Sequence, residues 1–218
     1  KRQTIYILRL IWRRIYSLKS SLDLIVLLVL LPRQTILQDN NNSTPAKSIT
    51  DQLSVAEVLW SAIGGLRAQT DLWHWFRGRD DQISLEMAVQ NGLISFYIVT
   101  PPKMRSFIEQ EINAVYPHAV LQEVSDYNVF LPHGVSVGAS LKLSRSSAFP
   151  LKTYKQFESD PLESLINAMA KIEAPAAAAL QLVIRSAPKS WRRRGIKIAS
   201  AMQQGKPLSQ VERFNMLE

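Results

Sequence analysis

A basic cluster near the end of the chain is the group of residues whose chemistry is easiest to name. Five cations surround one tryptophan within nine residues: Lys189, Trp191, Arg192, Arg193, Arg194 and Lys197. Lysine and arginine at this density can neutralise phosphates, of a nucleic acid or of lipid headgroups. Trp191 would then stack on a base or lie at a membrane interface, whereas the alternative is a solvated helix with Trp191 packed on the core. These six residues are our candidate phosphate or nucleic-acid contacts.

A second basic and aromatic segment lies near the beginning of the chain. Apolar residues at steps of three and four predict a helix over residues 5–31, which Pro32 ends. Its apolar run is too short to span a membrane and contains Lys19 and Asp23, so we expect a surface helix. The candidate membrane-surface residues are Arg9, Trp12, Arg13, Arg14 and Lys19. A helix packed on the domain's own core or on a neighbouring subunit explains the same pattern, and the sequence leaves both open.

Several kinds of chemistry are missing from the sequence. The chain has no cysteine, which excludes disulfides, zinc–cysteine sites, iron–sulfur clusters and thiol nucleophiles, and three histidines argue against a histidine-rich metal site. The only Gly-Lys pair is followed by Pro207, which cannot donate the backbone N–H that a phosphate-binding loop uses. Neither H-E-x-x-H nor G-x-S-x-G occurs. We therefore predict no catalytic residue, no metal, no cofactor and no enzyme activity.

The charge is distributed unevenly along the 218 residues, whose formal net charge is +8. An acidic middle lies between two basic ends, which indicates a domain with basic appendages. We predict a basic amphipathic arm over 1–37, a polar linker over 38–49, an α+β domain over 50–187 and a basic C-terminal helix over 188–218. Because the chain begins at Lys1 and stops soon after a basic helix, we expect it to be part of a longer protein.

The clearest local structure is a β-hairpin. Alternating apolar and polar residues over 83–89 are followed by Asn91-Gly92, which favours a type I′ turn, and by a second strand over 93–99. Further strands are predicted over 119–124, 136–143 and 180–185, and further helices over 101–116 and 161–172.

From residue 93 to residue 185 the predicted elements follow the split βαβ, ferredoxin-like order. The sequence therefore predicts an α+β fold, an antiparallel sheet with ferredoxin-like elements packed by helices, preceded by the amphipathic N-terminal helix. One conflict remains. The first strand of that order is central, so both of its edges are already paired, yet the hairpin needs one of them.

Several short motifs resemble a known family. They are Phe96-Tyr97, the proline before the next helix, Gln110, Tyr116-Pro117, Asp126-Tyr127, Phe149–Glu158, Asp160–Ser164, Gln181, Trp191-Arg192 and, before a polar linker, Leu30–Arg33. Over roughly residues 25–195 the chain is similar to an N-terminal accessory domain of conjugative-transfer, type IV secretion-like DNA-translocating ATPases of candidate-phyla bacteria.

The resemblance implies a membrane-proximal module on the cytoplasmic face of the bacterial inner or plasma membrane. None of the family's nucleotide-binding motifs falls in this sequence, so any ATPase activity would lie in a downstream region. We expect non-catalytic anchoring and assembly, with an anionic membrane surface, other secretion-system subunits or the downstream ATPase domain as partners. DNA and a second copy of the chain are further candidate partners. The alternatives are a freestanding nucleic-acid-binding module that uses the basic C-terminal helix, and an enzyme of unrecognised type on a ferredoxin-like sheet.

Overall fold

The computed structural model divides the chain into two compact units. The described residues are 7, 10–12, 14, 15, 23–32, 49–66, 69, 72, 74, 79, 81–131, 133–144, 147, 149, 151 and 162–207. One unit, here called the sheet unit, consists of Lys1–Ser136 and Thr153–Ser186. The other, here called the basic unit, consists of Val137–Lys152 and Ala187–Glu218. The predicted linker lies outside the described residues, apart from Ile49.

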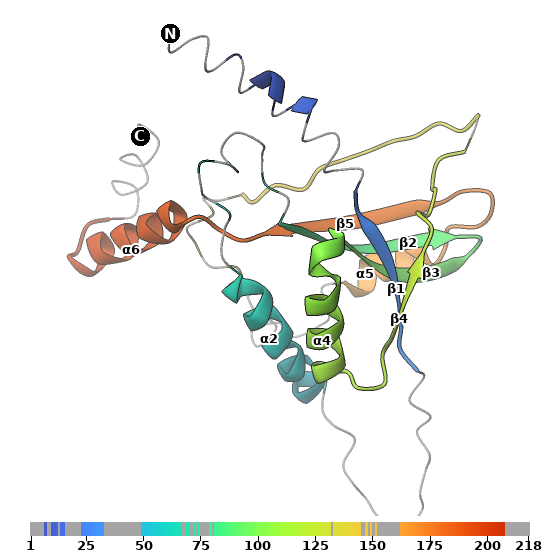
Figure 1. Cartoon of the computed structure of the whole chain (residues 1–218), viewed down its shortest axis with the longest axis horizontal. Helices are drawn as coiled ribbons and strands as arrows, with labels where there is room; N and C mark the ends of the chain where they lie inside the picture. Colours follow the sequence, from blue (N-terminus) through green and yellow to red (C-terminus); the bar gives the residue numbers. More distant parts are fainter. Residues whose placement is uncertain are drawn as a thin grey trace, which may run out of the picture. The chain divides into compact units, whose positions relative to one another are not determined.

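A five-stranded antiparallel sheet is the framework of the sheet unit (Figure 1). Its strands are β1 (Ile25–Leu30), β2 (Gln82–Gln90), β3 (Leu93–Thr100), β4 (Val120–Val124) and β5 (Ala178–Arg185). They lie in the order β4-β1-β3-β2-β5, and each neighbouring pair is antiparallel. The described helices that cover this sheet are α2 (Ile49–Gly65), α4 (Arg105–Val115) after a 3₁₀ turn at Pro102–Met104, and α5 (Glu163–Met169). The predicted α+β fold is therefore confirmed.

The predicted hairpin is also present. β2 and β3 pair from Ser84↔Val99 to Gln90↔Leu93, and the turn between them is Asn91-Gly92. Asn91 and Gly92 have φ angles of 51° and 75°, in the left-handed region that a type I′ turn requires. Two residues with positive φ give the turn the twist of the flanking strands, so this short signal fixes the register of the whole pair.

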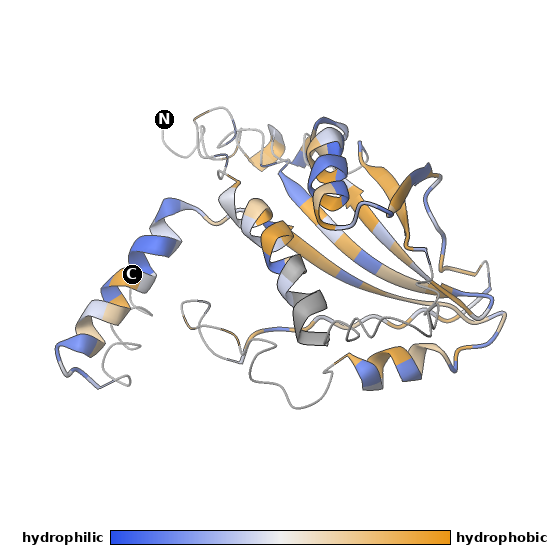
Figure 2. Ribbon diagram, turned by 90° about the horizontal axis from the view of Figure 1, so that it is seen from below, coloured by the Kyte–Doolittle hydropathy of each residue, from blue (hydrophilic) through white to orange (hydrophobic). Residues whose placement is uncertain are grey.

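The apolar core lies between one face of the sheet and the helices that cover it (Figure 2). Its main cluster joins strand residues to α2 and α4 and consists of Leu27, Ile63, Ile83, Ile98, Ile108 and Ile112. A second cluster joins Met87 and Val89 of β2 to Met169 at the end of α5. Side chains alternate along a strand, so Met87 and Val89 point to the same side of β2 as Ile83.

The predicted helix over residues 5–31 is wrong at its end, because Ile25–Leu30 forms β1. This strand lies inside the sheet between β4 and β3, and Leu27 is 0% exposed. A continuous apolar run of eight residues suits a strand buried on both faces as well as a helix, so periodicity cannot separate the two. β-Branched side chains at Ile25, Val26 and Val29 and the following Pro32 favour the strand.

The predicted strand over 136–143 is wrong as well. This segment has no ladder partner, and its described neighbours show no regular structure. The ferredoxin-like order is therefore not formed by residues 93–185. The order strand, helix, two strands, helix, strand runs instead from β1 to β4. In this sheet β3 pairs with β1 along one edge and with β2 along the other. The hairpin of β2 and β3 therefore fits into the sheet without conflict.

In the described part of the basic unit the main element is the helix α6 (Lys189–Gln203), which begins after Pro188 as predicted. The indole Nε1 of Trp191 donates hydrogen bonds to the backbone O of Ser147 at 3.2 Å and to its Oγ at 3.3 Å. Ile198, seven residues further along the helix, is buried. Within the described part of the chain, no helix combines the length and the apolar character that crossing a membrane requires.

Candidate functional site

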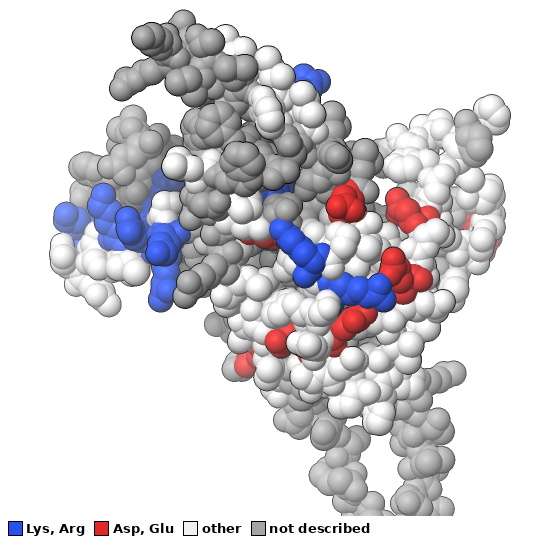
Figure 3. Space-filling view, viewed as in Figure 1, with Lys and Arg blue, Asp and Glu red and all other residues white. Residues whose placement is uncertain are grey.

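All six predicted phosphate-contact residues lie on α6, and all are exposed. With 3.6 residues per turn, Lys189, Arg193 and Lys197 align along one side of the helix, and we call these three the basic row. Arg192 and Arg194 flank the row on either side. Figure 3 shows the blue lysine and arginine side chains that gather on this helix. The structure therefore brings the predicted cations together on one element.

The tryptophan of this cluster lies on another side of the helix. Helical geometry puts Trp191 on the same side as Ile198 and Met202, away from the basic row. Ile198 is only 5% exposed, and the Trp191 indole is hydrogen-bonded to Ser147, so part of this side contacts the basic unit. Trp191 and Met202 are each 45% exposed and Ile196 is 60% exposed, so α6 presents apolar as well as charged residues outward.

The excess positive charge of the chain belongs to the basic unit. This unit contains ten lysines and arginines and two glutamates, whereas the sheet unit contains sixteen residues of each sign. The first turn of α6 has no acidic residue and no side-chain cap on its N–H groups. Because a helix N-terminus carries partial positive charge, cations there add to its field instead of neutralising it. An anion bound beside this turn would be attracted both by the helix N-terminus and by the nearby cations.

The described residues of the N-terminal arm are helical. They are Ile7, Leu10, Ile11, Trp12, Arg14 and Ile15, and their apolar members are about half exposed. Ile7, Leu10, Ile11 and Ile15 follow the i, i+3, i+4, i+8 spacing of one helix side, and we call these four the apolar stripe. Arg9, Arg13 and Lys19, which were predicted to lie on a membrane surface, are outside the described residues.

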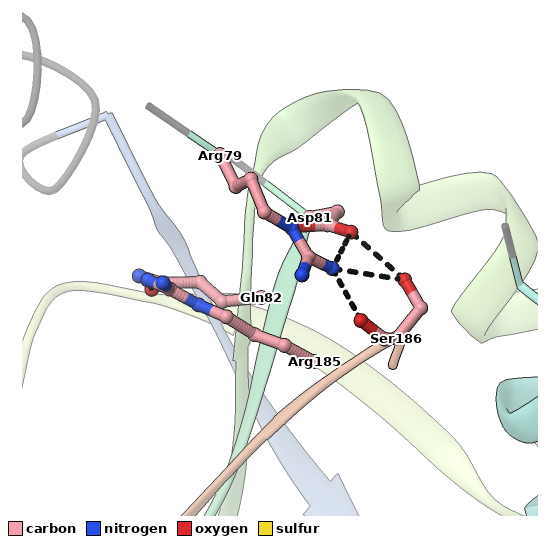
Figure 4. Close-up of polar contacts among 5 residues, drawn as sticks. All are labelled: Arg79, Asp81, Gln82, Arg185 and Ser186. Atoms are coloured by element: carbon pink, nitrogen blue, oxygen red, sulfur yellow. Dashed lines mark hydrogen bonds and ion pairs between the residues drawn. The ribbon is translucent and has the colours of Figure 1, made fainter. Parts of the chain in front are cut away.

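A polar cluster that the sequence did not reveal joins the start of β2 to the end of β5 (Figure 4). The Arg79 guanidinium donates from Nε to Asp81 Oδ1 at 2.9 Å and from Nη2 to the backbone O of Ser186 at 2.5 Å. Ser186 Oγ donates to Asp81 Oδ2 at 2.8 Å. Beside it, Arg185 Nη2 donates to Gln82 Oε1 at 2.5 Å.

These bonds also determine the ionisation of Asp81. Burial raises the pKa of this carboxyl, but the hydrogen bonds from Arg79 and Ser186 and the nearby guanidinium charge outweigh burial, so the pKa is lowered from its ordinary value. The carboxylate is thus held ionised with its oxygens already bonded. Such a group stabilises the start of β2 against the end of β5 and is poorly suited to proton transfer.

A second polar cluster lies on the sheet face opposite the apolar core. Glu86 accepts hydrogen bonds from Tyr127 OH at 2.5 Å and from Ser84 Oγ at 2.6 Å. The Tyr127 ring stacks on Tyr97 with centroids 4.6 Å apart. Burial and the bond to Glu86 raise the pKa of the Tyr127 phenol, and a bond with Gln181 opposes them only in part. A phenol held neutral in this way anchors the segment after β4 to the sheet.

The sequence contained only a partial signal for these two clusters. Ser84 and Glu86 are the polar positions of the alternating β2 pattern, and Tyr127 belongs to a motif of the family resemblance. Glu86 and Tyr127 are 41 residues apart in the sequence, and Asp81 and Ser186 are 105 residues apart. Within the described part of the chain, no group of three or more metal-ligating side chains occurs.

One family model matches the chain, over residues 44–214, and its description is a domain of unknown function, DUF8128. The match extends from α2 to α6 and leaves the arm and β1 outside. No curated protein and no solved structure matches the chain. Because the match covers well over half of the sequence, the chain belongs to the DUF8128 family.

Proposed function

We propose that this chain is a non-catalytic, membrane-proximal module that anchors and assembles a larger machine at an anionic membrane surface. The resemblance to secretion and conjugative DNA-transfer ATPases supplies the kind of machine. The apolar stripe of the arm, which is about half exposed, is the observation that carries the proposal. In this role the polar clusters of the sheet unit hold the fold together and perform no chemistry.

The arm has the composition of a helix that lies on a membrane. Its first 22 residues contain six lysines and arginines and no acidic residue. Helices of this kind insert an apolar side into the headgroup boundary, and each cation near an anionic surface adds about 1 kcal/mol. The arm leads into β1, an inner strand of the sheet, so a membrane-bound arm would hold the sheet unit close to the surface.

Vesicle co-sedimentation of the full chain tests the proposal, with anionic phosphatidylglycerol vesicles compared with neutral phosphatidylcholine vesicles. Deleting residues 1–37 would remove β1, so the informative variant is the double substitution Ile11→Glu/Ile15→Glu. We expect binding to anionic vesicles that this variant reduces by about tenfold or more, because it puts two charges into the apolar stripe. The control Val58→Glu/Leu93→Glu makes the same change at exposed residues of α2 and β3. Equal binding of both variants, or no binding of the folded chain, would contradict the proposal.

A second candidate function, nucleic-acid binding through α6, is favoured by a separate observation. The helix α6 carries five exposed cations and no acidic residue. Three of these cations form the basic row, and a phosphate backbone requires cations in a row. This arrangement favours a nucleic acid as a second candidate partner.

Fluorescence anisotropy with a labelled DNA duplex tests this candidate at several salt concentrations. The variant Lys189→Glu/Arg193→Glu changes two members of the basic row, and we expect it to weaken binding by about tenfold or more and to flatten the salt dependence. Arg194 and Lys197 are left unchanged because each interacts with another group in the structure. The control Lys142→Glu/Lys206→Glu makes the same charge change at exposed residues of the same unit. If both variants bind equally, α6 is not the DNA-binding surface.

A further inference from the structure

One edge of the sheet lacks the features that usually protect an edge strand. Among the described residues, β5 is the last strand in the sheet order, and one side of its backbone has no ladder partner there. Its residues from Ala178 to Ile184 contain no charge, and Leu182 and Val183 are each more than half exposed. The opposite edge strand, β4, is only five residues long and carries Glu123, which is paired with Arg105. Long, uncharged edges pair readily with another strand.

The same chain contains an extended segment that has no ladder partner among the described residues. Residues 135–143, here called the donor segment, alternate Val135, Val137, Ala139, Leu141 and Leu143 with serine, glycine and lysine. This is the pattern of a half-buried strand. Yet Val135 is 95% exposed, and Val137 and Leu141 are each 92% exposed. These three apolar side chains therefore have almost no cover from the described residues around them.

The donor segment and the β5 edge match in length and in pattern. The segment has nine residues and β5 has eight. On β5, Leu180, Leu182 and Ile184 lie on the side of the apolar core, in register with Met87, Leu85 and Ile83 of β2. Gln181 and Val183 lie on the other side. An added strand would extend the core side with its valines and leucines and the other side with its serines.

We propose that the donor segment pairs with the β5 edge of a second copy of this chain. Each chain carries both the strand and the edge, so two copies can exchange two identical contacts and close as a symmetric dimer. The backbone groups of β5 that lack a partner are satisfied, and the exposed valines and leucines of the segment become covered. This inference does not depend on the proposed function, because neither the arm nor α6 takes part.

Cross-linking of mixed single-cysteine chains tests the pairing, and the chain's lack of cysteine keeps the background low. We would mix full-length Ser140→Cys with tagged Val183→Cys, add a short bismaleimide and resolve the mixed dimer by its size. The matched control replaces Val183→Cys with Val120→Cys on the β4 edge, since the two valines are 58% and 57% exposed. We expect a mixed covalent dimer with Val183→Cys and only collisional background with Val120→Cys.

Sedimentation velocity gives a second, independent readout. Val137→Asp/Leu141→Asp puts two charges on the apolar side of the donor segment, and Ser136→Asp/Ser140→Asp puts the same charges on its polar side. We expect the first variant to be monomeric and the second to dimerise like the unsubstituted chain. All four side chains are exposed, so folding of the chain itself should be unaffected.

Three results would overturn the pairing with a second copy. The first is a chain that sediments as a monomer at all concentrations. The second is a doubly substituted Ser140→Cys/Val183→Cys chain that cross-links only within itself, which would assign the segment to its own β5. The third is equal cross-linking to Val183→Cys and Val120→Cys, which would show contact without specific pairing.

Discussion

The sheet unit and the basic unit use the same charged residue types in opposite ways. In the sheet unit, sixteen cations and sixteen anions balance, and described members pair with each other, as Arg79 does with Asp81 and Arg105 with Glu109. In the basic unit, α6 carries five cations and no acidic residue. The difference separates charges that balance within one unit from an excess of one sign in the other. Substitutions should therefore affect stability in one unit and binding in the other.

The largest stability effect should come from the apolar core of the sheet unit rather than from any charge. Leu27→Ala removes a fully buried side chain from the inner strand β1, and we expect a loss of about 2–5 kcal/mol in the free energy of unfolding. Leu31→Ala is the matched control, because Leu31 follows the same strand and is 60% exposed. Urea denaturation followed by circular dichroism measures both. Equal losses would show that β1 is not part of the core.

β1 also shows how far the sequence can predict the fold. The hairpin of β2 and β3 was predicted because its signals, alternation and Asn-Gly, are local to one short stretch. β1 has no alternation, and its partners, β3 and β4, begin more than 60 residues further along the chain. The donor segment has the alternation of a strand but no ladder partner among the described residues of its own chain. A pattern thus predicts what a segment can form, whereas pairing depends on residues that are distant in sequence.

The next largest effect should come from the Asp81 cluster. Asp81→Ala leaves the partly buried Arg79 guanidinium without its carboxylate, and we expect a loss of about 1–3 kcal/mol at neutral pH. Asp126→Ala serves as the control, since Asp126 is an exposed acid of the same unit. Equilibrium unfolding in urea measures both variants. A loss for Asp81→Ala no larger than that for Asp126→Ala would mean that this cluster does not stabilise the sheet unit.

The effect of Asp81 should depend on pH in a defined direction. Its pKa is lowered in the folded chain, so the ionised carboxylate stabilises the fold above the unfolded value of about 4. As the pH falls through the folded pKa, this contribution is lost. The difference in unfolding free energy between Asp81→Ala and the unsubstituted chain should therefore be constant near neutral pH and shrink below about pH 4. A difference that stays constant into acid would show that ionisation of Asp81 is not its cause.

A smaller effect is expected at the sheet's second face. Tyr127→Phe keeps the ring that stacks on Tyr97 and removes the hydroxyl bonded to Glu86, which should cost about 1 kcal/mol. Because the pKa of Tyr127 is raised, its contribution is present below the unfolded value of about 10 and is lost as the pH rises further. The stability difference should shrink in alkali. Tyr116→Phe is the control, and a similar loss there would mean that the bond to Glu86 is not the cause.

The candidate site shows the same division between local and distant information. The cations of α6 were predicted correctly as a cluster because they are neighbours in sequence and share one helix. The position of Trp191 away from the basic row follows from helical spacing together with the burial of Ile198, which only the structure reveals. Glu86 and Tyr127 meet only because the segment after β4 returns over the sheet, and no spacing in the sequence predicts that contact.

The smallest stability effect should come from the basic row, and it tests the comparison of the two units most directly. Lys189→Glu/Arg193→Glu exchanges one like-charge pair spaced i, i+4 for another and puts acids near a helix N-terminus, where negative charge favours an isolated helix. We therefore expect the free energy of unfolding to stay within about 0.5 kcal/mol of the unsubstituted chain, or to rise slightly, while phosphate binding falls. Lys142→Glu/Lys206→Glu should change neither quantity. A loss of more than about 1 kcal/mol for the basic-row variant would mean that these cations stabilise their own unit, and their charge would then no longer indicate an anionic partner.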